Sequence, residues 1–188
     1  LLGEGCRGSL SRQVIEQFNL DRHAQPQTYG LGFKEIWRVE GDDHRPGNVV
    51  HTAGWPLSGA GNGSNYGGGF LYALEDNQLV VGLVVALDYR NPYLDPFQEF
   101  QRFKTHPSIA ARLRGAKRLS FGARTLVEGG AQALPKLTFP GGALIGDGAG
   151  FLNAAKNKGI HNALRSGRIA AEAIFQGLVD GYDAGAEP

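Results

Sequence analysis

The nine residues LVVGLVVAL, numbers 79–87, are the longest apolar run of the chain and decide how its centre folds. A helix that crosses a membrane needs about 20 apolar residues, so this run is too short to span one. Its valines and its length are typical of a buried strand. Immediately upstream, Phe70, Tyr72 and Leu74 alternate with other residues, which predicts a second strand that leads into the run through a short turn.

Two further strands are predicted before these. Residues 29–39 alternate partly around Leu31 and Phe33, and residues 49–55 follow the turn signal GDDHRPG. Four strands joined by short turns favour an antiparallel sheet.

Two helices are predicted after the sheet. Asp95 is a good N-cap, Pro96 suits the first helical position, and the helix should extend to Lys104. Its phenylalanines, at 97, 100 and 103, recur at helical spacing and are expected to face the core, with a membrane-facing surface as the alternative. A second helix should start at His106-Pro107 and end at Gly115.

The two ends of the chain look like pieces of a different domain. Leu1 and Leu2 resemble the end of a strand that runs through a glycine turn into a helix near residues 10–18. At the other end, residues 118–123, 136–139 and 143–145 are short strand candidates, and 146–159 is a long loop. A helical stripe follows, made of Ile160, Ala163, Leu164, Gly167, Ala170, Ala171 and Ile174. The last residues, 181–188, are predicted to be a frayed tail.

Charge and cysteine content exclude several classes of protein. Nineteen Lys and Arg against eighteen Asp and Glu leave a net charge of +1 without a basic block, so no nucleic-acid partner is expected. Cys6 is the single cysteine, which excludes an internal disulfide and the paired spacing of a zinc or iron–sulfur site. Asp42, Asp43 and His44 share one turn, where a solvated loop is favoured over a metal site.

Glycine supplies 29 of the 188 residues, roughly twice the usual share, and methionine none. The absence of methionine makes Leu1 an improbable natural start, so the chain is expected to be an excerpt or a processed product. The glycines are expected where the backbone turns sharply or lies close to something.

The strongest chemical signal is the segment LIGDGAG at 144–150, followed by the helix from Gly159. The Asp147 carboxylate can accept hydrogen bonds from sugar or ribityl hydroxyls, and the helix N-terminus favours negative charge. As a Rossmann fingerprint the segment fails, because Asn153 stands where a third glycine is needed. A plain strand–loop–helix connection stays open as the alternative.

A second glycine-rich stretch runs from 61 to 69. Because a strand follows it, a phosphate cradle that opens a helix is not favoured. Two interpretations stay open: a flexible hairpin connection, or a place where a flat ligand lies against the backbone at Gly67 and Gly68.

These segments carry a family resemblance. The chain resembles the electron transfer flavoprotein–ubiquinone oxidoreductases, which use FAD and a [4Fe–4S] cluster. The similarity covers almost the whole chain and includes EGCRGSL at 4, PQTYGLGFKEIW at 26, HTAGWPL at 51, YGGGFLY at 66, GLVVALDYRNPYLDPFQEFQRFKTHPSI at 82 and PKLTFPGGALIGDGAGFLNAAKNKGIHNALRSG at 135.

The resemblance implies residue roles. Glu4 and Gly5 look like the second FAD contact of this superfamily, and Gly146, Asp147 and Gly148 like the third. The helix from Gly159 would aim its N–H groups at the N1–O2 edge of the flavin. The family's ubiquinone-contacting glycines match Gly67 and Gly68, and residues 151–158 would dip into the lipid interface. Val127 departs from the polar residue expected there.

The fold class implied is α+β: an antiparallel quinone-side sheet with flanking helices, plus pieces of a glutathione-reductase-type FAD domain. Residues 1–25 would belong to the FAD domain, 26–115 to the ubiquinone-binding sheet domain, and 116–180 to the FAD domain again. The family's N-terminal GxGxxG strand–helix and its C-terminal cysteine cluster are both expected outside this chain. Alone, the chain is therefore not expected to bind FAD tightly or turn over.

The implied function is membrane-associated electron transfer from reduced electron transfer flavoprotein, through FAD and the cluster, to ubiquinone. No catalytic acid–base residue is required for outer-sphere transfer. The setting would be the surface of the bacterial cytoplasmic membrane, or the mitochondrial inner membrane in a eukaryote. The alternatives are a flavin-dependent reductase of isoprenoid chains and a non-catalytic module that binds protein or lipid.

Overall fold

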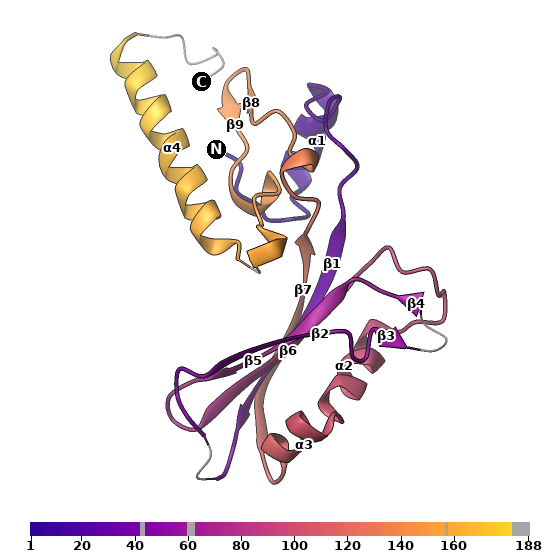
Figure 1. The fold of residues 1–188 in the computed structure, drawn as a ribbon. Coiled ribbons are helices and arrows are strands. Elements are labelled where there is room, and N and C mark those ends of the chain that lie inside the picture. The colour runs from indigo at the N-terminus through magenta and orange to yellow at the C-terminus, as the bar shows by residue number, and fades with distance from the viewer. Residues whose placement is uncertain (42–43, 60–62, 157, 182–188) are drawn as a thin grey trace. The chain divides into compact units, whose positions relative to one another are not determined.

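The computed structural model describes residues 1–41, 44–59, 63–156 and 158–181, and the chain divides into two compact units (Figure 1). The sheet unit is Gly30–Arg124, and the terminal unit combines Leu1–Tyr29 with Thr125–Pro188. Beyond Gly181, the tail predicted at 181–188 lies outside the described residues.

A five-stranded antiparallel sheet forms the sheet unit, in the order β2-β5-β6-β1-β7. The bounds are β1 (Tyr29–Arg38), β2 (Val49–Ala53), β5 (Gly67–Ala73), β6 (Gln78–Ala86) and β7 (Lys117–Val127). The apolar run is the middle strand β6, and its residues 79–86 are all buried. Strand β6 pairs with β5 on one side and β1 on the other. A separate small ladder joins β3 (Ser58–Gly59) to β4 (Gly63–Ser64).

Helices α2 (Pro96–Lys104) and α3 (Pro107–Leu113) lie on one face of this sheet (Figure 1). Helix α2 has the predicted bounds because Asp95 Oδ1 accepts the N–H groups of Phe97 and Gln98, at 2.8 and 3.3 Å. Phe100 and Phe103 are each 1% exposed within the core, which confirms the predicted stripe there. Phe97, at the start of the helix, is 48% exposed.

The sequence analysis missed the fifth strand of the sheet. It predicted four strands and placed a short strand at 118–123 in the other domain, whereas the eleven-residue β7 forms the edge of this sheet. Residues 117–124 are all exposed, so they lack the apolar alternation of a half-buried strand. The sheet unit therefore extends to Arg124 rather than to the predicted boundary at 115.

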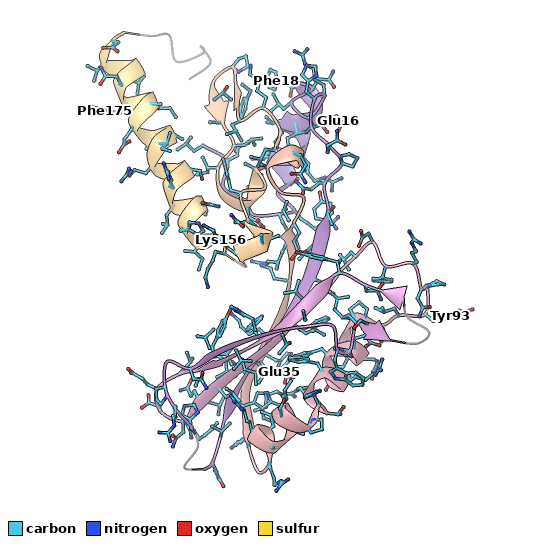
Figure 2. The ribbon with its side chains drawn as sticks, viewed as in Figure 1. Glu16, Phe18, Glu35, Tyr93, Lys156 and Phe175 are labelled. Atoms are coloured by element: carbon cyan, nitrogen blue, oxygen red, sulfur yellow. The ribbon has the colours of Figure 1, made fainter. Side chains whose placement is uncertain are left out.

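A buried carboxylate joins three elements of the sheet unit. Figure 2 labels Glu35 in the sheet unit, where it lies on β1. Its side chain is buried, at 2% exposed, and accepts hydrogen bonds from Trp37 Nε1 at 2.9 Å, Lys104 Nζ at 2.8 Å and Arg118 Nη1 at 3.1 Å. Lys104 belongs to α2 and Arg118 to β7. Glu35 thus fixes a helix and an edge strand to β1 while its own charge stays compensated.

The terminal unit is built from short elements and one long helix. They are α1 (Ser9–Gln17), η1 (Ala131–Ala133), β8 (Thr138–Phe139), β9 (Gly142–Ala143), η2 (Gly146–Gly148), η3 (Ala154–Lys156) and α4 (Ile160–Val179). The predicted strand end at the N-terminus is confirmed, because Leu2 forms a parallel bridge with Leu144. Leu20, Leu144 and Ala149 make the buried core of this unit.

Helix α4 confirms part of the predicted stripe. Ala163, Gly167, Ala170 and Ile174 are half-buried, as predicted, whereas Ile160, at 81%, Leu164 and Ala171 are exposed. Phe175 points outward from the same helix (Figure 2). The half-buried residues of the stripe are mostly small, and the large apolar residues Ile160 and Leu164 are the ones that the prediction placed wrongly. Within the described residues, no helix has the length and apolar character that a membrane crossing requires.

Alanine substitutions at two glycines of the sheet test how tightly the neighbouring side chains are packed. A Cβ added at Gly69 would lie 2.1 Å from Cζ of the buried Phe103, and one at Gly82 would lie 2.1 Å from Cζ of the half-buried Phe70. We expect Gly69→Ala to reduce the unfolding free energy by about 2–3 kcal/mol. Gly82→Ala should cost less because the Phe70 ring can swing away.

Urea unfolding of the chain checks this order. Gly122→Ala is the control, since no atom lies within 4 Å of its added Cβ, and it should change stability by less than about 0.5 kcal/mol. Equal midpoints for Gly69→Ala and Gly122→Ala would contradict the packing described.

Candidate functional site

The Glu4 carboxylate caps helix α1. Its Oε2 accepts the Ser11 N–H at 2.7 Å and the Ser11 hydroxyl at 2.8 Å, and its Oε1 accepts the Leu10 N–H at 3.4 Å. These donors, the Ser11 N–H first, lower the pKa of Glu4. Gly8 makes room for the cap, because an added Cβ would lie 2.5 Å from the Glu4 Cβ. The acidic group that the sequence assigned to a cofactor contact is therefore engaged within the chain.

A Gly-x-Gly-x-x-Gly spacing does occur in the chain, at Gly3, Gly5 and Gly8, and the sequence analysis overlooked it. It follows a strand end and opens α1, as in dinucleotide sites, where the helix N-terminus faces a pyrophosphate. Here the Glu4 carboxylate already binds the N–H groups of the first turn. The spacing therefore does not create an anion site at α1.

The Gly5 turn borders a large cavity in the terminal unit. Gly5 has φ +80° and open space around its Cα, and a Cβ at Gly148 would lie 3.5 Å from the Gly5 carbonyl oxygen. Both glycines line a cavity of about 890 Å³, whose charged lining residues are Arg7, Arg12, Glu16 and Asp21. This volume is in the range of cofactor sites, and the two guanidinium groups can bind the anionic part of an occupant.

Asp147 lies next to Gly148 but does not line that cavity. Gly146, at φ +62°, donates its N–H to Ser166 Oγ on α4 at 3.0 Å, which fixes the turn to the helix. The Asp147 carboxylate accepts the Val127 N–H, while its Oδ1 is buried without a hydrogen-bond partner among the described residues. Burial raises the pKa of Asp147. An unpaired buried acceptor of this kind fits a ligand that brings hydroxyl donors.

The N-terminus of α4 has backbone N–H groups that could bind a negatively charged group of a ligand. Gly159 is its N-cap, no described side chain caps the first turn, and that turn carries no acidic residue. Gly159 has φ −124°, and its added Cβ would meet Leu152 at an ordinary 3.5 Å. Nothing described within the chain requires glycine there.

The two candidate quinone residues, Gly67 and Gly68, lie in the sheet unit. A Cβ at Gly67 would lie 2.2 Å from the Val84 carbonyl oxygen, and one at Gly68 would lie 2.5 Å from the Thr52 carbonyl oxygen. The neighbouring strands thus give both glycines a sufficient reason to be glycine. The other six candidates, Glu4, Gly5, Gly146, Asp147, Gly148 and Gly159, all belong to the terminal unit.

The weaker candidates have internal partners. His44 Nε2 lies 2.7 Å from the Leu74 carbonyl oxygen, and its neighbours Asp42 and Asp43 are outside the described residues. Cys6 Sγ donates to the Thr125 carbonyl oxygen at 2.9 Å. In the part of the chain that the structure describes, no group of three His, Cys, Asp or Glu could hold a metal ion.

The raised pKa of Asp147 predicts a pH dependence of stability. Between the ordinary carboxyl pKa and the raised value, the native state binds more protons than the unfolded state, so this group makes stability fall as the pH rises above about 4. Asp147→Asn should remove that dependence and stabilise the chain at pH 7.5 by about 1 kcal/mol.

Urea unfolding of the parent chain and of Asp147→Asn at pH 4.5 and 7.5 measures this pH dependence of stability. Asp88→Asn, at an exposed position, is the control. The prediction would be refuted if Asp147→Asn raised the unfolding free energy over that of the parent chain by no more at pH 7.5 than at pH 4.5.

Comparison with known proteins gives consistent matches. The family model described as "ETF-QO, ubiquinone-binding" matches residues 29–126. The chain is 53% identical over 187 residues to the electron transfer flavoprotein-ubiquinone oxidoreductase of Pseudomonas aeruginosa, covering 100% of this chain and 33% of that protein. It is 56% identical over 181 residues to the mitochondrial protein of that name in Caenorhabditis elegans, and the match covers 95% of this chain and 29% of that protein. It is 53% identical over 180 residues to the mitochondrial protein of Homo sapiens, and this match covers 95% of this chain and 28% of that protein. The chain thus spans about a third of the length of these relatives.

Proposed function

The chain belongs to the electron transfer flavoprotein–ubiquinone oxidoreductases, and from that premise we propose that it is the central part of an enzyme that passes electrons from reduced electron transfer flavoprotein to ubiquinone. FAD and a [4Fe–4S] cluster would carry the electrons. The observation that carries this proposal is the unpaired, buried Oδ1 of Asp147, which lies on a turn bonded to α4.

We infer that the terminal unit is part of an FAD domain. Asp147 would accept hydrogen bonds from ribityl hydroxyls, and Arg7 and Arg12 would balance the charge of the pyrophosphate beside the Gly5 and Gly148 turns. The uncapped N-terminus of α4 would favour negative charge at the N1–O2 edge of the ring. FAD supplies the redox chemistry when bound. Glu4 would be a positioning residue, because its carboxylate holds α1 and thereby the Gly5 turn.

The sheet unit would hold the quinone. The ubiquinone-binding family model covers residues 29–126, and Gly67 and Gly68 would contact the head group through their backbone. Electron transfer to the quinone at short range needs no catalytic acid or base at the donor. The two protons that convert the reduced quinone to the quinol would come from water, so the residues of this unit need only hold the quinone ring in position.

The cluster's cysteine ligands would lie outside this chain, because a [4Fe–4S] cluster needs four thiolates and Cys6 is the single cysteine. We place the protein peripherally on the bacterial cytoplasmic membrane, or on the mitochondrial inner membrane in a eukaryote. Residues 151–158, of which Asn157 lies outside the described residues, would meet the lipid interface.

The longer native polypeptide tests the proposed function directly. We expect it to purify with the visible absorption of bound flavin and to reduce a short-chain ubiquinone when reduced electron transfer flavoprotein is supplied. The 188 residues alone should purify without FAD. A colourless, inactive longer protein would contradict the proposal and favour a binding module.

Gly68 offers a test of the quinone site. Gly68→Ala in the longer polypeptide should reduce ubiquinone reduction about tenfold or more, while the flavin spectrum and its reduction by electron transfer flavoprotein stay as in the parent. The reason is that the added Cβ would lie 2.5 Å from the Thr52 carbonyl oxygen and would shift the backbone that the quinone contacts. Ala111→Ser, at an exposed position of α3 outside both proposed binding surfaces, is the control. Unchanged quinone kinetics, or loss of the flavin together with activity, would assign Gly68 to the fold alone.

A further inference from the structure

Strand β7 leaves one edge of the sheet open. It is the outermost strand next to β1, and residues 117–124 are all exposed. Among the described residues, the backbone of 117–124 makes no hydrogen bond outside the strand ladder. Such an edge presents a row of N–H and C=O groups that can pair with another extended chain.

The middle of this edge has no charged residue. Leu119, Ser120, Phe121, Gly122 and Ala123 form an uncharged stretch. Phe121 is 77% exposed, and the Arg118 guanidinium carbon lies 5.1 Å from its ring centroid. Arg118 is itself held by the buried Glu35 at 3.1 Å. An exposed, long strand with an apolar centre is either an aggregation hazard or a docking edge.

Basic residues flank the uncharged centre. Lys117 and Arg118 precede it, Arg124 follows it, and no acidic residue occurs between Lys117 and Val127. On the neighbouring β1, Lys34 and Arg38 are also exposed. Glu35, the acid that contacts β7, is buried and already bonded to three donors. Glu40 is exposed beside Gly115, before β7 begins. Among the described residues, neither Lys117 nor Arg124 forms an ion pair, so each end of the edge carries an exposed positive charge.

This charge pattern argues against a second copy as the occupant. Two antiparallel β7 strands centred on Phe121 would place Arg118 of each copy opposite Arg124 of the other. Like charges directly opposite each other destabilise a strand pair, whereas carboxylates at those positions stabilise it.

We propose that the open edge of β7 docks an extended, acidic segment of a protein partner by strand addition. Main-chain hydrogen bonds would give affinity, an apolar side chain would pack on Phe121, and carboxylates would pair with Lys117 and Arg124. The choice of probe rests on the proposed function: electron transfer flavoprotein is the partner protein that must dock on this enzyme.

Hydrogen exchange on the longer native polypeptide tests the docking edge. The outward amides of 117–124 should exchange quickly in the free protein and at least about tenfold more slowly with saturating electron transfer flavoprotein. Phe121→Ser and the double variant Lys117→Glu/Arg124→Glu should each weaken binding about tenfold, and the effect of the double variant should shrink at high salt. Arg90→Glu, an exposed charge reversal elsewhere in the sheet unit, should leave binding unchanged.

Several results would overturn the proposal. One is binding that protects other segments and leaves 117–124 unchanged. Another is protection of 117–124 in the free protein, where sedimentation would show whether a second copy or the same polypeptide covers the edge. Electron transfer to ubiquinone, measured on the same sample, separates the two claims: activity without β7 protection refutes only the docking edge, and absence of both binding and activity refutes the proposed function with it.

Discussion

The unpaired carboxylate oxygen of Asp147 is the constraint on which the account of this chain depends. Segments from both ends of the sequence hold it: Leu2 bridges Leu144, Ser166 of α4 accepts the Gly146 N–H, and Val127 donates to the carboxylate itself. The fold thus keeps a charged group partly buried with one oxygen unsatisfied, which costs stability. A ligand rich in hydroxyl groups would donate a hydrogen bond to this oxygen and remove that cost. The unpaired oxygen is therefore explained by a ligand and not by the packing of the chain itself.

Three carboxylates of the chain differ in their hydrogen-bond donors, and these donors indicate whether each carboxylate has a structural role or a ligand-binding role. Glu35 is buried and bonded to three donors, so it fastens α2 and β7 to β1. Glu4 is bonded to the first turn of α1, so it shapes the Gly5 turn without needing a ligand. Asp147 alone of the three retains a buried oxygen without a partner among the described residues. The same residue type therefore serves as a core link, a helix cap and a candidate ligand site, according to the donors around it.

The sequence predicted those elements whose signals are local. Helix α2 followed from its Asp95-Pro96 start, and β6 from its apolar run. It missed β7, because an exposed edge strand has no buried face to impose alternation. On α4 it placed Ala163, Gly167 and Ala170 correctly on the inner face but wrongly added Ile160 and Leu164, which are exposed. The roles of Glu4 and Glu35 depend on donors that folding brings together, and no spacing in the sequence shows such contacts. The Gly-Asp turn was predictable as a candidate, but its unpaired oxygen was not.

FAD affinity measures most directly whether Asp147 holds the cofactor. The longer native polypeptide should be prepared with Asp147→Ala and with Glu172→Gln, an exposed carboxylate farther along α4, and titrated with FAD after removal of bound flavin. We expect Asp147→Ala to stay folded and to bind FAD at least about tenfold more weakly than the parent, while Glu172→Gln matches the parent. Equal FAD affinity for Asp147→Ala and the parent would contradict this expectation.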